Sequence, residues 1–472
     1  MSDLLIDNVR VITMAQDETC PNYIEDGAIL IEGDSIVTVA DRASVTGDVD
    51  RVVDGDRNLA LPGMLNGHNH FEQSFMKASV RLYEGTTAEW IQNYKIPLTN
   101  EMTREDYYLS HMLTCIDLIR SGVTCSVNHV CQQHPDKLRE FGLEEGMRAI
   151  RKAGIRSVVP IGLAGKNEPD DFVVPADVYE SFLRDTMEKW HESADGRIRV
   201  WPGPTGFYSA TEPMWETAKA ISEEWETGIH THIATFEDGD IQRATERDLL
   251  GPNFVGAHCV WLSERDVVEM ADGEMKVVHN PTYKLGYSVD STVEEFGDGI
   301  APIADMADHG CTVGLGQDGC MGDTQDMFKE MRALGLTQQY RYRDKALFPP
   351  TKLLEMATID CAKTMLWDDE IGSLEPGKKA DVVLLDLSES KFTPLQNLPA
   401  NVVYQANAEN VSTVFIDGQV VLDDRTVTTV DEGKLLGRAQ DAAEALFERA
   451  GLDDLVDKGF DPWNSSCRHT SP

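Results

Sequence analysis

Seven of the twelve histidines lie in short apolar runs or at the ends of such runs, where a buried metal site could form. These histidines are His68, His70, His129, His230, His232, His258 and His279. On a β-strand, residues two apart point to the same face, so His68 and His70 could present two imidazoles to one ion. An HxH pair is equally compatible with two hydrogen-bonded core histidines, so the residues that follow must decide between these interpretations.

An aspartate, Asp318, follows the histidine series in the run CTVGLGQDG. Zinc and iron(II) accept imidazole nitrogen and carboxylate oxygen, and a site with open coordination needs only three or four protein ligands. Asp318 would complete such a set. Taken alone, the pair Asp318-Gly319 is also a common turn, and that alternative stays open from spacing alone.

Six segments together resemble the amidohydrolase superfamily, specifically its cytosine-deaminase-like branch. They are LPGMLNGHNH, HTHIAT, GAHCVWLSERD, VVHNPTYKLGYS, GIAPIADMADHGCTVGLGQDG and GSLEPGKKADVVLLDL. The branch contains S-adenosylhomocysteine and methylthioadenosine deaminases, guanine deaminases, and triazine chlorohydrolases and aminohydrolases. The resemblance runs in the family's order from about residue 4 to about residue 425.

The resemblance implies a role for each matching residue. His68, His70, His232 and Asp318 match the ligands of one divalent metal ion, with Zn²⁺ expected first and Fe²⁺ as the alternative. Such an ion lowers the pKa of bound water from about 15.7 toward 7. Asp318 would take the proton of that water, and His258 would stabilise the developing charge or polarise the ring.

Further positions are expected to contact the substrate. Glu89 and Trp90 resemble an acidic-aromatic pair of the deaminases, although a helix start with a buried tryptophan is an alternative. His129 is a candidate pocket residue, and His279 would either support the site from behind or contact the substrate. His230 is expected deeper in the interior. Candidate aromatic lining residues are Phe71, Trp90, Phe207, Tyr208, Tyr283 and Tyr287.

The chain departs from the deaminase pattern at several positions. Thr235 stands where these deaminases carry a glutamate that shuttles a proton to the ring nitrogen, and a hydroxyl is a much weaker acid. Glu237 could substitute for it or could be a solvated loop residue. Ile161 and Thr205 replace an arginine and a histidine of the nucleoside deaminases, so recognition of an adenine ring and an amino-acid carboxylate is not supported.

These observations favour a metal-dependent amidohydrolase that attacks an sp² carbon of a small N-heterocyclic compound and expels ammonia. A chlorohydrolase acting on a triazine-like ring is an alternative, because a different leaving group changes the demand on the missing acid. A non-catalytic metal- or ligand-binding descendant is a second alternative. Asp318 and His258 count against this descendant, because a binder needs neither proton carrier.

Composition limits the partners and the compartment. The chain carries 81 Asp and Glu against 42 Lys and Arg, a net charge of −39. Concentrated salt would screen this self-repulsion, so we expect a high-salt cytoplasm, and no nucleic acid or membrane partner. No apolar run has membrane-spanning length, the N-terminus lacks a signal pattern, and the nine cysteines lack paired spacing. The family likeness implies a homo-oligomer.

The elements that must position these residues follow an α/β pattern. Residues 61–374 alternate strand and helix, with eight strands in sequence, which predicts a (β/α)8 TIM barrel with the ligands at the carboxyl ends of its strands. Residues 1–60 and 375–430 read as strands, and by likeness form a small composite β-sandwich domain. Residues 431–472 read as a C-terminal helix and tail.

Overall fold

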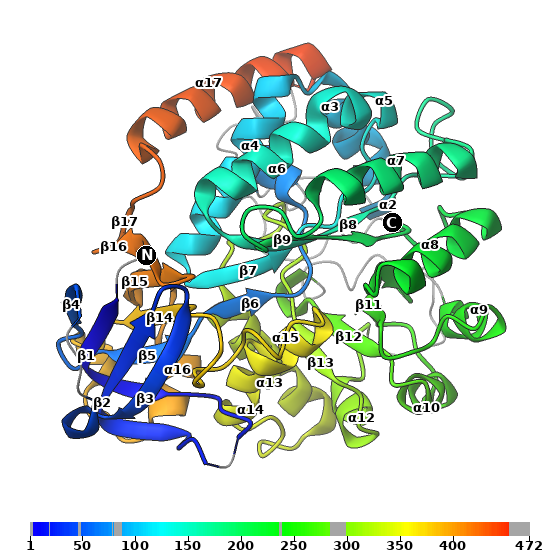
Figure 1. The fold of residues 1–472 in the computed structure, drawn as a ribbon. Helices are drawn as coiled ribbons and strands as arrows, with labels where there is room; N and C mark the ends of the chain where they lie inside the picture. The colour runs from blue at the N-terminus through cyan, green and yellow to red at the C-terminus, as the bar shows by residue number, and fades with distance from the viewer. Residues whose placement is uncertain are drawn as a thin grey trace, which may run out of the picture.

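The computed structural model describes residues 3–17, 19–45, 49–77, 79, 87–235, 238–283 and 299–452. Within them the chain is a mixed α/β protein with one large mixed sheet, two parallel sheets and helices packed around the parallel strands (Figure 1). No described helix combines the length and the apolar character that crossing a lipid bilayer requires.

The mixed sheet joins the two ends of the chain. Its order is β17-β16-β15-β14-β5-β1-β2-β3, with β4 beside β1. β14 pairs antiparallel with β5, so Val382 lies opposite Pro62. Asp417 and Gly418 connect β15 to β16 with φ of 52° and 69°, the positive values that a two-residue type I′ hairpin turn requires. The strands are β1 Leu4–Ile12, β2 Tyr23–Glu32, β3 Ser35–Asp41, β4 Arg51–Asp54, β5 Leu59–Pro62, β14 Val382–Leu385, β15 Val411–Ile416, β16 Gln419–Asp423 and β17 Thr426–Val427.

Eight parallel strands form two four-stranded sheets, β6-β7-β8-β9 and β10-β11-β12-β13. All eight predicted strands are found. Nearly every residue in them is buried, as expected for parallel strands that are covered on both faces. The strands are β6 Met64–Asn66, β7 Val123–Val127, β8 Arg156–Ile161, β9 Ile198–Pro202, β10 Ile229–Ile233, β11 Phe254–His258, β12 Lys276–His279 and β13 Val313–Leu315.

Hydrogen bonds link the two parallel sheets near the ends of their strands. The Gly67 N–H donates to the Leu315 carbonyl at 2.8 Å, and the Asp318 N–H donates to the His68 carbonyl at 2.9 Å. On the other side, Thr231 Oγ1 donates to the Pro204 carbonyl at 2.7 Å. The segments that carry the predicted metal ligands therefore lie next to one another. Closure of the eight strands into one barrel stays a prediction.

Helices connect and cover the parallel strands (Figure 1). Two of them begin at capping boxes, Thr103 with Asp106 for α4 and Ser263 with Asp266 for α10. The helices are α2 Thr87–Trp90, α3 Ile96–Glu101, α4 Arg104–Arg120, α5 Pro135–Lys137, α6 Leu143–Ala153, α7 Ala176–Trp190, α8 Glu212–Glu224, α9 Asp240–Glu246, α10 Glu264–Asp272, α12 Ile303–Asp308, α13 Met327–Tyr342, α14 Pro350–Met356, α15 Ile359–Thr364, α16 Leu398–Gln405 and α17 Glu432–Ala450. Shorter turns are η1 Arg42–Ser44, η2 Phe71–Met76, η3 Ile91–Lys95, η4 Leu138–Gly142, η6 Ser390–Phe392 and η7 Ala408–Asn410, of which η3 and η4 are π-helical.

A buried ion-pair network connects the first parallel sheet to the mixed sheet. Arg156 of β8 donates from Nε to Asp381 Oδ2 at 2.9 Å and also binds Asp417. Arg197 donates to Asp417 Oδ2 at 2.9 Å. Each buried charge in this network has a partner of opposite sign, so both sheets are fixed relative to each other at one point.

The predicted C-terminal helix is confirmed as α17, which crosses the outside of α3 and α4 (Figure 1). Arg449 donates to Asp106 Oδ2 at 2.6 Å, and Arg438 donates to Glu105 Oε1 at 2.6 Å. The predicted tail from residue 453 onward lies outside the described residues.

Candidate metal centre and active site

Two of the five residues expected to perform the chemistry lie at the carboxyl ends of strands, and the other three lie shortly beyond the ends of two further strands. His232 is in β10 and His258 is the last residue of β11. His68 and His70 follow β6, and Asp318 follows β13. Parallel strands end at a common edge, so residues far apart in the sequence meet there.

Their side-chain atoms converge. Asp318 Oδ1 lies 3.0 Å from His68 Nε2 and 3.4 Å from His70 Nε2. His232 Nε2 lies 3.3 Å from His70 Nε2, and His258 Nε2 lies 3.9 Å from Asp318 Oδ2. Ligand atoms of His68, His232, His258 and Asp318 all lie within 4.8 Å of one another. All five side chains are buried.

Hydrogen bonds behind the site fix the protons of two histidines. His70 Nδ1 donates to the His129 carbonyl at 2.7 Å, and His232 Nδ1 donates to the Thr205 carbonyl at 2.6 Å. In a neutral imidazole the other nitrogen, Nε2, then carries a lone pair. Two lone pairs that face each other at 3.3 Å repel unless a proton or a metal ion lies between them. Burial acts to lower the pKa of His70, but Cys131 and Asp318 outweigh it and raise that pKa to about 10, so the pair of rings is set to hold a positive charge. This arrangement therefore fits a metal ion.

The electrostatic state of the side chains fits the same conclusion. Burial lowers the pKa of His232 well below its usual value, so the ring is neutral and able to bind a metal. Burial acts to raise the pKa of Asp318, but His258, together with His68 and His70, outweighs it and holds that pKa well below the usual range. Asp318 Oδ2 is buried and has no hydrogen-bond partner among the described residues, as expected of an oxygen that awaits a ligand.

The backbone is strained at the two residues expected to move protons. His258 has φ of 80° and Asp318 has φ of 68°, in the left-handed region that non-glycine residues rarely occupy. Such conformations are concentrated at functional sites. Gly319 follows with φ of 95°, and a Cβ there would lie 2.0 Å from Gln73 Oε1, so only glycine fits.

His258 differs from His70 and His232 in which ring nitrogen carries the proton. Asn280 Nδ2 donates to His258 Nδ1 at 3.1 Å, which places the ring proton on Nε2. That nitrogen points toward Asp318, so His258 presents a donor N–H to the site. A donor is suited to an oxygen or nitrogen that gains negative charge, whereas a metal ligand must present a lone pair.

The remaining predicted histidines lie behind or beside the centre. His230 Nε2 contacts His68 Nδ1 at 2.8 Å, which agrees with its predicted deeper position. His129 Nε2 donates to the Gly203 carbonyl at 2.9 Å, and its ring stacks on His232 with centroids 4.7 Å apart. His279 is buried at the end of β12. Neither His129 nor His279 lines the adjoining cavity.

A cavity opens directly over the cluster. Besides the metal-site residues, four residues that the sequence predicted to contact the substrate line this cavity, namely Trp90, Tyr208, Thr235 and Tyr283. Thr235 Oγ1 is buried without a hydrogen-bond partner among the described residues. The full lining is His70, Gln73, Trp90, Ile91, Lys95, Gln132, Tyr208, His232, Thr235, His258, Tyr283, Asp318 and Met321.

Other sequence candidates lie elsewhere. Glu89 is exposed on α2 and does not line the cavity. Phe71 and Phe207 belong to the hydrophobic core. Glu237 and Tyr287 lie outside the described residues. The sequence reasoning missed Lys95 and the glutamine side chains of the cavity, because nothing in their local pattern distinguishes them from solvated polar residues.

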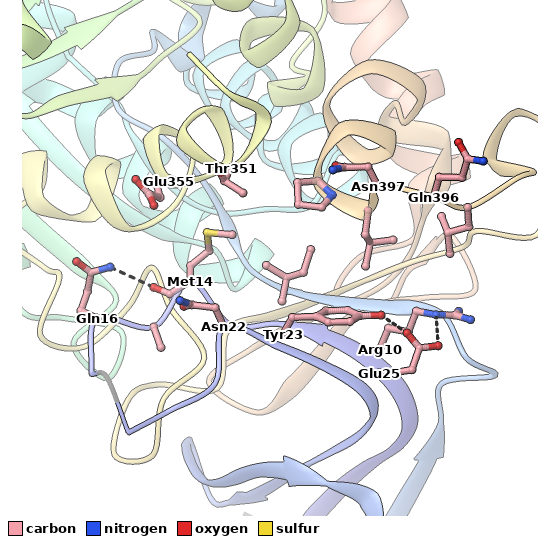
Figure 2. A pocket seen from close by; sticks show the side chains of 15 residues that line it. Arg10, Met14, Gln16, Asn22, Tyr23, Glu25, Thr351, Glu355, Gln396 and Asn397 are labelled. Carbon is pink, nitrogen blue, oxygen red and sulfur yellow. Dashed lines mark hydrogen bonds and ion pairs between the residues drawn. The ribbon is translucent and has the colours of Figure 1, made fainter. Parts of the chain in front are cut away.

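A second cavity of about 630 Å³ lies between the mixed sheet and the segments that carry α14 and α16 (Figure 2). Figure 2 shows that some of its polar groups bind one another: Arg10 Nε donates to Glu25 Oε1 at 3.3 Å, and Tyr23 also binds Glu25. None of the residues predicted to act in chemistry lines it. The cavity over the histidine cluster is therefore the candidate active site.

Comparisons with known proteins identify the family. Residues 59–421 match the model of the amidohydrolase family. The chain is 30% identical to a 5-methylthioadenosine/S-adenosylhomocysteine deaminase from Thermoanaerobacter pseudethanolicus, over 95% of this chain and 100% of the relative. It is 28% identical to a 5'-deoxyadenosine deaminase from Methanosarcina barkeri, over 95% and 99%.

Solved structures show the same fold. A mutant of atrazine chlorohydrolase from Arthrobacter aurescens, crystallised with zinc and atraton, aligns with a TM-score of 0.84 at 21% identity. The alignment covers 93% of this chain and 100% of that chain. At this identity the likeness concerns the fold.

Proposed function

The chain belongs to the amidohydrolase family and is a hydrolase of carbon–nitrogen bonds other than peptide bonds, and we propose that it deaminates a small amino-substituted N-heterocycle with a metal-activated water. The observation that carries this proposal is a cluster beneath one cavity in which His68, His232, His258 and Asp318 come within 4.8 Å of one another and His70 contacts Asp318 and His232. We further propose that the eight parallel strands close into a barrel, and that residues 1–60 and 375–430 form one β-domain.

We assign the metal ligands as His68, His70, His232 and Asp318. Imidazole nitrogen and carboxylate oxygen are ligands that Zn²⁺ binds readily, and a divalent ion there would supply a water whose pKa is about 7. Zn²⁺ is proposed ahead of Fe²⁺ because the structural relative was crystallised with zinc. The hydrogen bonds from His70 and His232 to backbone carbonyls orient both rings for binding.

Side chains of the protein would transfer the protons, stabilise the developing charge and orient the ring. Asp318 is buried and ionised, and its Oδ2 has no hydrogen-bond partner among the described residues. It can therefore take a proton from the water that attacks the ring carbon. His258 Nε2–H can donate to the ring atom that gains negative charge. The proton held by Asp318 is then available to the departing nitrogen, which leaves as ammonia. The hydroxyl of Thr235 can orient the ring by a hydrogen bond.

The test is a screen for ammonia release from aminopurines, aminopyrimidines, pterins and aminotriazines, with and without a chelator, in concentrated salt. We expect chelator-sensitive ammonia release that Asp318→Asn lowers by about a thousandfold. The exposed Asp248→Asn, which removes an ion pair with Lys219, is the matched control and should leave turnover unchanged.

Chlorotriazines form the second arm of the same screen, because the structural relative is a chlorohydrolase. Chloride release without ammonia release would replace deamination by dehalogenation. Stoichiometric metal with no product from either arm would contradict the proposal.

A further inference from the structure

A buried ion pair beside the active-site cavity has no part in the steps above. Lys95 ends the π-helical turn η3, and its Nζ lies 3.3 Å from Glu72 Oε1 in η2. The exposed fractions of the two side chains are 2% and 0%. Removing two charges from water is costly even when they are paired, and π-turns occur frequently at functional sites. The pair therefore calls for an explanation beyond packing.

The two charges have different positions relative to the cavity. Lys95 lines it together with His232 and Asp318, whereas Glu72 does not. The ammonium group thus faces the cavity and the carboxylate supports it from behind. An ammonium has three N–H donors. Lys95 donates to Gln132 Oε1 at 3.4 Å and forms an ion pair with Glu72, whose carboxylate oxygens have no hydrogen-bond partner among the described residues. At least one N–H of the ammonium is therefore left for a bound molecule.

A second residue of the cavity lining carries a buried donor. Trp90 Nε1 is buried without a hydrogen-bond partner among the described residues, and Trp90 also lines the cavity. A buried donor without a partner destabilises the folded protein, and a ligand that supplies an acceptor removes this cost. Two donor residues in one cavity lining, one of them charged, match a ligand that carries an oxygen with high electron density.

The Lys95 ammonium is suited to binding and unsuited to proton donation. Burial acts to lower the pKa of Lys95, but the Glu72 carboxylate outweighs burial and raises it. An ammonium with a raised pKa stays charged at neutral pH, so it serves as a fixed positive charge.

We propose that Lys95 is a specificity-determining residue that selects N-heterocycles carrying an oxo group, and that Glu72 positions its ammonium. This inference rests on the proposed function, whose substrate class it narrows. An oxo group conjugated to a nitrogen ring carries partial or full negative charge and would receive the hydrogen bond from Lys95. A ring without that oxygen would leave the ammonium desolvated.

The test compares matched pairs of compounds: guanine with 2-aminopurine, and isocytosine with 2-aminopyrimidine. A single Lys95→Met variant would leave Glu72 buried and unpaired, so the double variant Lys95→Met/Glu72→Gln removes both charges together. The control is Lys77→Met/Asp117→Asn, which removes a more exposed ion pair outside the cavity. Metal content and thermal unfolding establish that each variant folds.

We expect the wild type to prefer the oxo compound of each pair by about tenfold or more in kcat/KM, as a charge-assisted hydrogen bond supplies. The cavity double variant should lose this preference, and the control should keep it. Ammonia release with the same preference in all three proteins would overturn the inference while the proposed function stands.

Equilibrium dialysis of the same compounds against the zinc-loaded proteins separates the two proposals. If no compound releases ammonia, but the oxo compounds bind more tightly to the wild type than to the cavity double variant, the proposed function fails and the assignment of Lys95 stands. Equal binding by both proteins, or no binding, would overturn the assignment of Lys95.

Discussion

At the scale of single residues, the protons on the histidine rings decide the chemistry. His70 and His232 each use Nδ1 to donate to a backbone carbonyl, and His258 instead accepts from Asn280. The first two therefore offer lone pairs and the third offers an N–H donor. The same residue type can thus bind a metal or stabilise negative charge, depending on the hydrogen bond on its far side.

Thr235 carries the first prediction. Thr235 lines the cavity at the position where the family resemblance implies an acid, and its hydroxyl has no hydrogen-bond partner among the described residues. Thr235→Glu should therefore raise kcat for ammonia release by about tenfold to a hundredfold, because general acid catalysis contributes on that order. Steady-state kinetics on any ring that the screen identifies would measure the change.

The control for that experiment is Thr235→Gln, which adds the same volume without an acidic proton. It should not raise kcat. Unchanged or lower turnover in Thr235→Glu would show that another group already delivers the proton.

At the scale of elements, helix α13 holds one wall of the cavity through a buried carboxyl group. Glu330 accepts from the Thr282 N–H at 2.9 Å and also binds the Thr282 hydroxyl. Thr282 precedes Tyr283, which lines the cavity. Burial raises the pKa of Glu330 to about 8 from an ordinary value of 4.5.

This pKa predicts how stability depends on pH. Because the folded pKa is raised, the unfolded chain releases this proton first, and Glu330 lowers the free energy of unfolding progressively from pH 4.5 to about 8. Glu330→Gln should flatten that decline, as measured by urea unfolding across this range. Glu444→Gln on the exposed face of α17 is the control. An unchanged decline in Glu330→Gln would contradict the prediction.

The parallel strands were predictable because their signal is local. Each of the eight apolar runs that predicted a parallel strand contains one, and the resemblance placed His68, His232 and Asp318 at a common edge. Burial by distant segments was not predictable. Lys95 lies in IQNYKIP, a run whose polar residues read as solvated, and only the folded chain brings Glu72 and Gln132 against it. Glu89 read as a pocket residue, but it is exposed.

At the scale of the whole molecule, charge is the dominant property. A net charge of −39 on a compact chain produces repulsion that salt screens within about 10 Å at 0.1 M and about 3 Å at 1 M. Ion pairs such as Arg438–Glu105 and Lys219–Asp248 neutralise only part of the acidic surface. Stability should therefore depend on ionic strength.

We predict that the midpoint of thermal unfolding rises by at least about 5 °C when KCl increases from about 0.1 M to about 2 M, because screening removes repulsion. Differential scanning calorimetry measures the shift. Sucrose, which stabilises proteins without screening charge, is the control. An equal midpoint at both KCl concentrations would contradict the expectation of a protein adapted to high salt.

The central claim is one divalent ion held by His68, His70, His232 and Asp318. X-ray diffraction from zinc-loaded crystals, recorded on both sides of the zinc absorption edge, tests it most directly. We predict one anomalous peak about 2.0–2.2 Å from three imidazole nitrogens and the Asp318 carboxylate. No peak among these residues, or a peak bound instead by His129 and His230, would contradict the account.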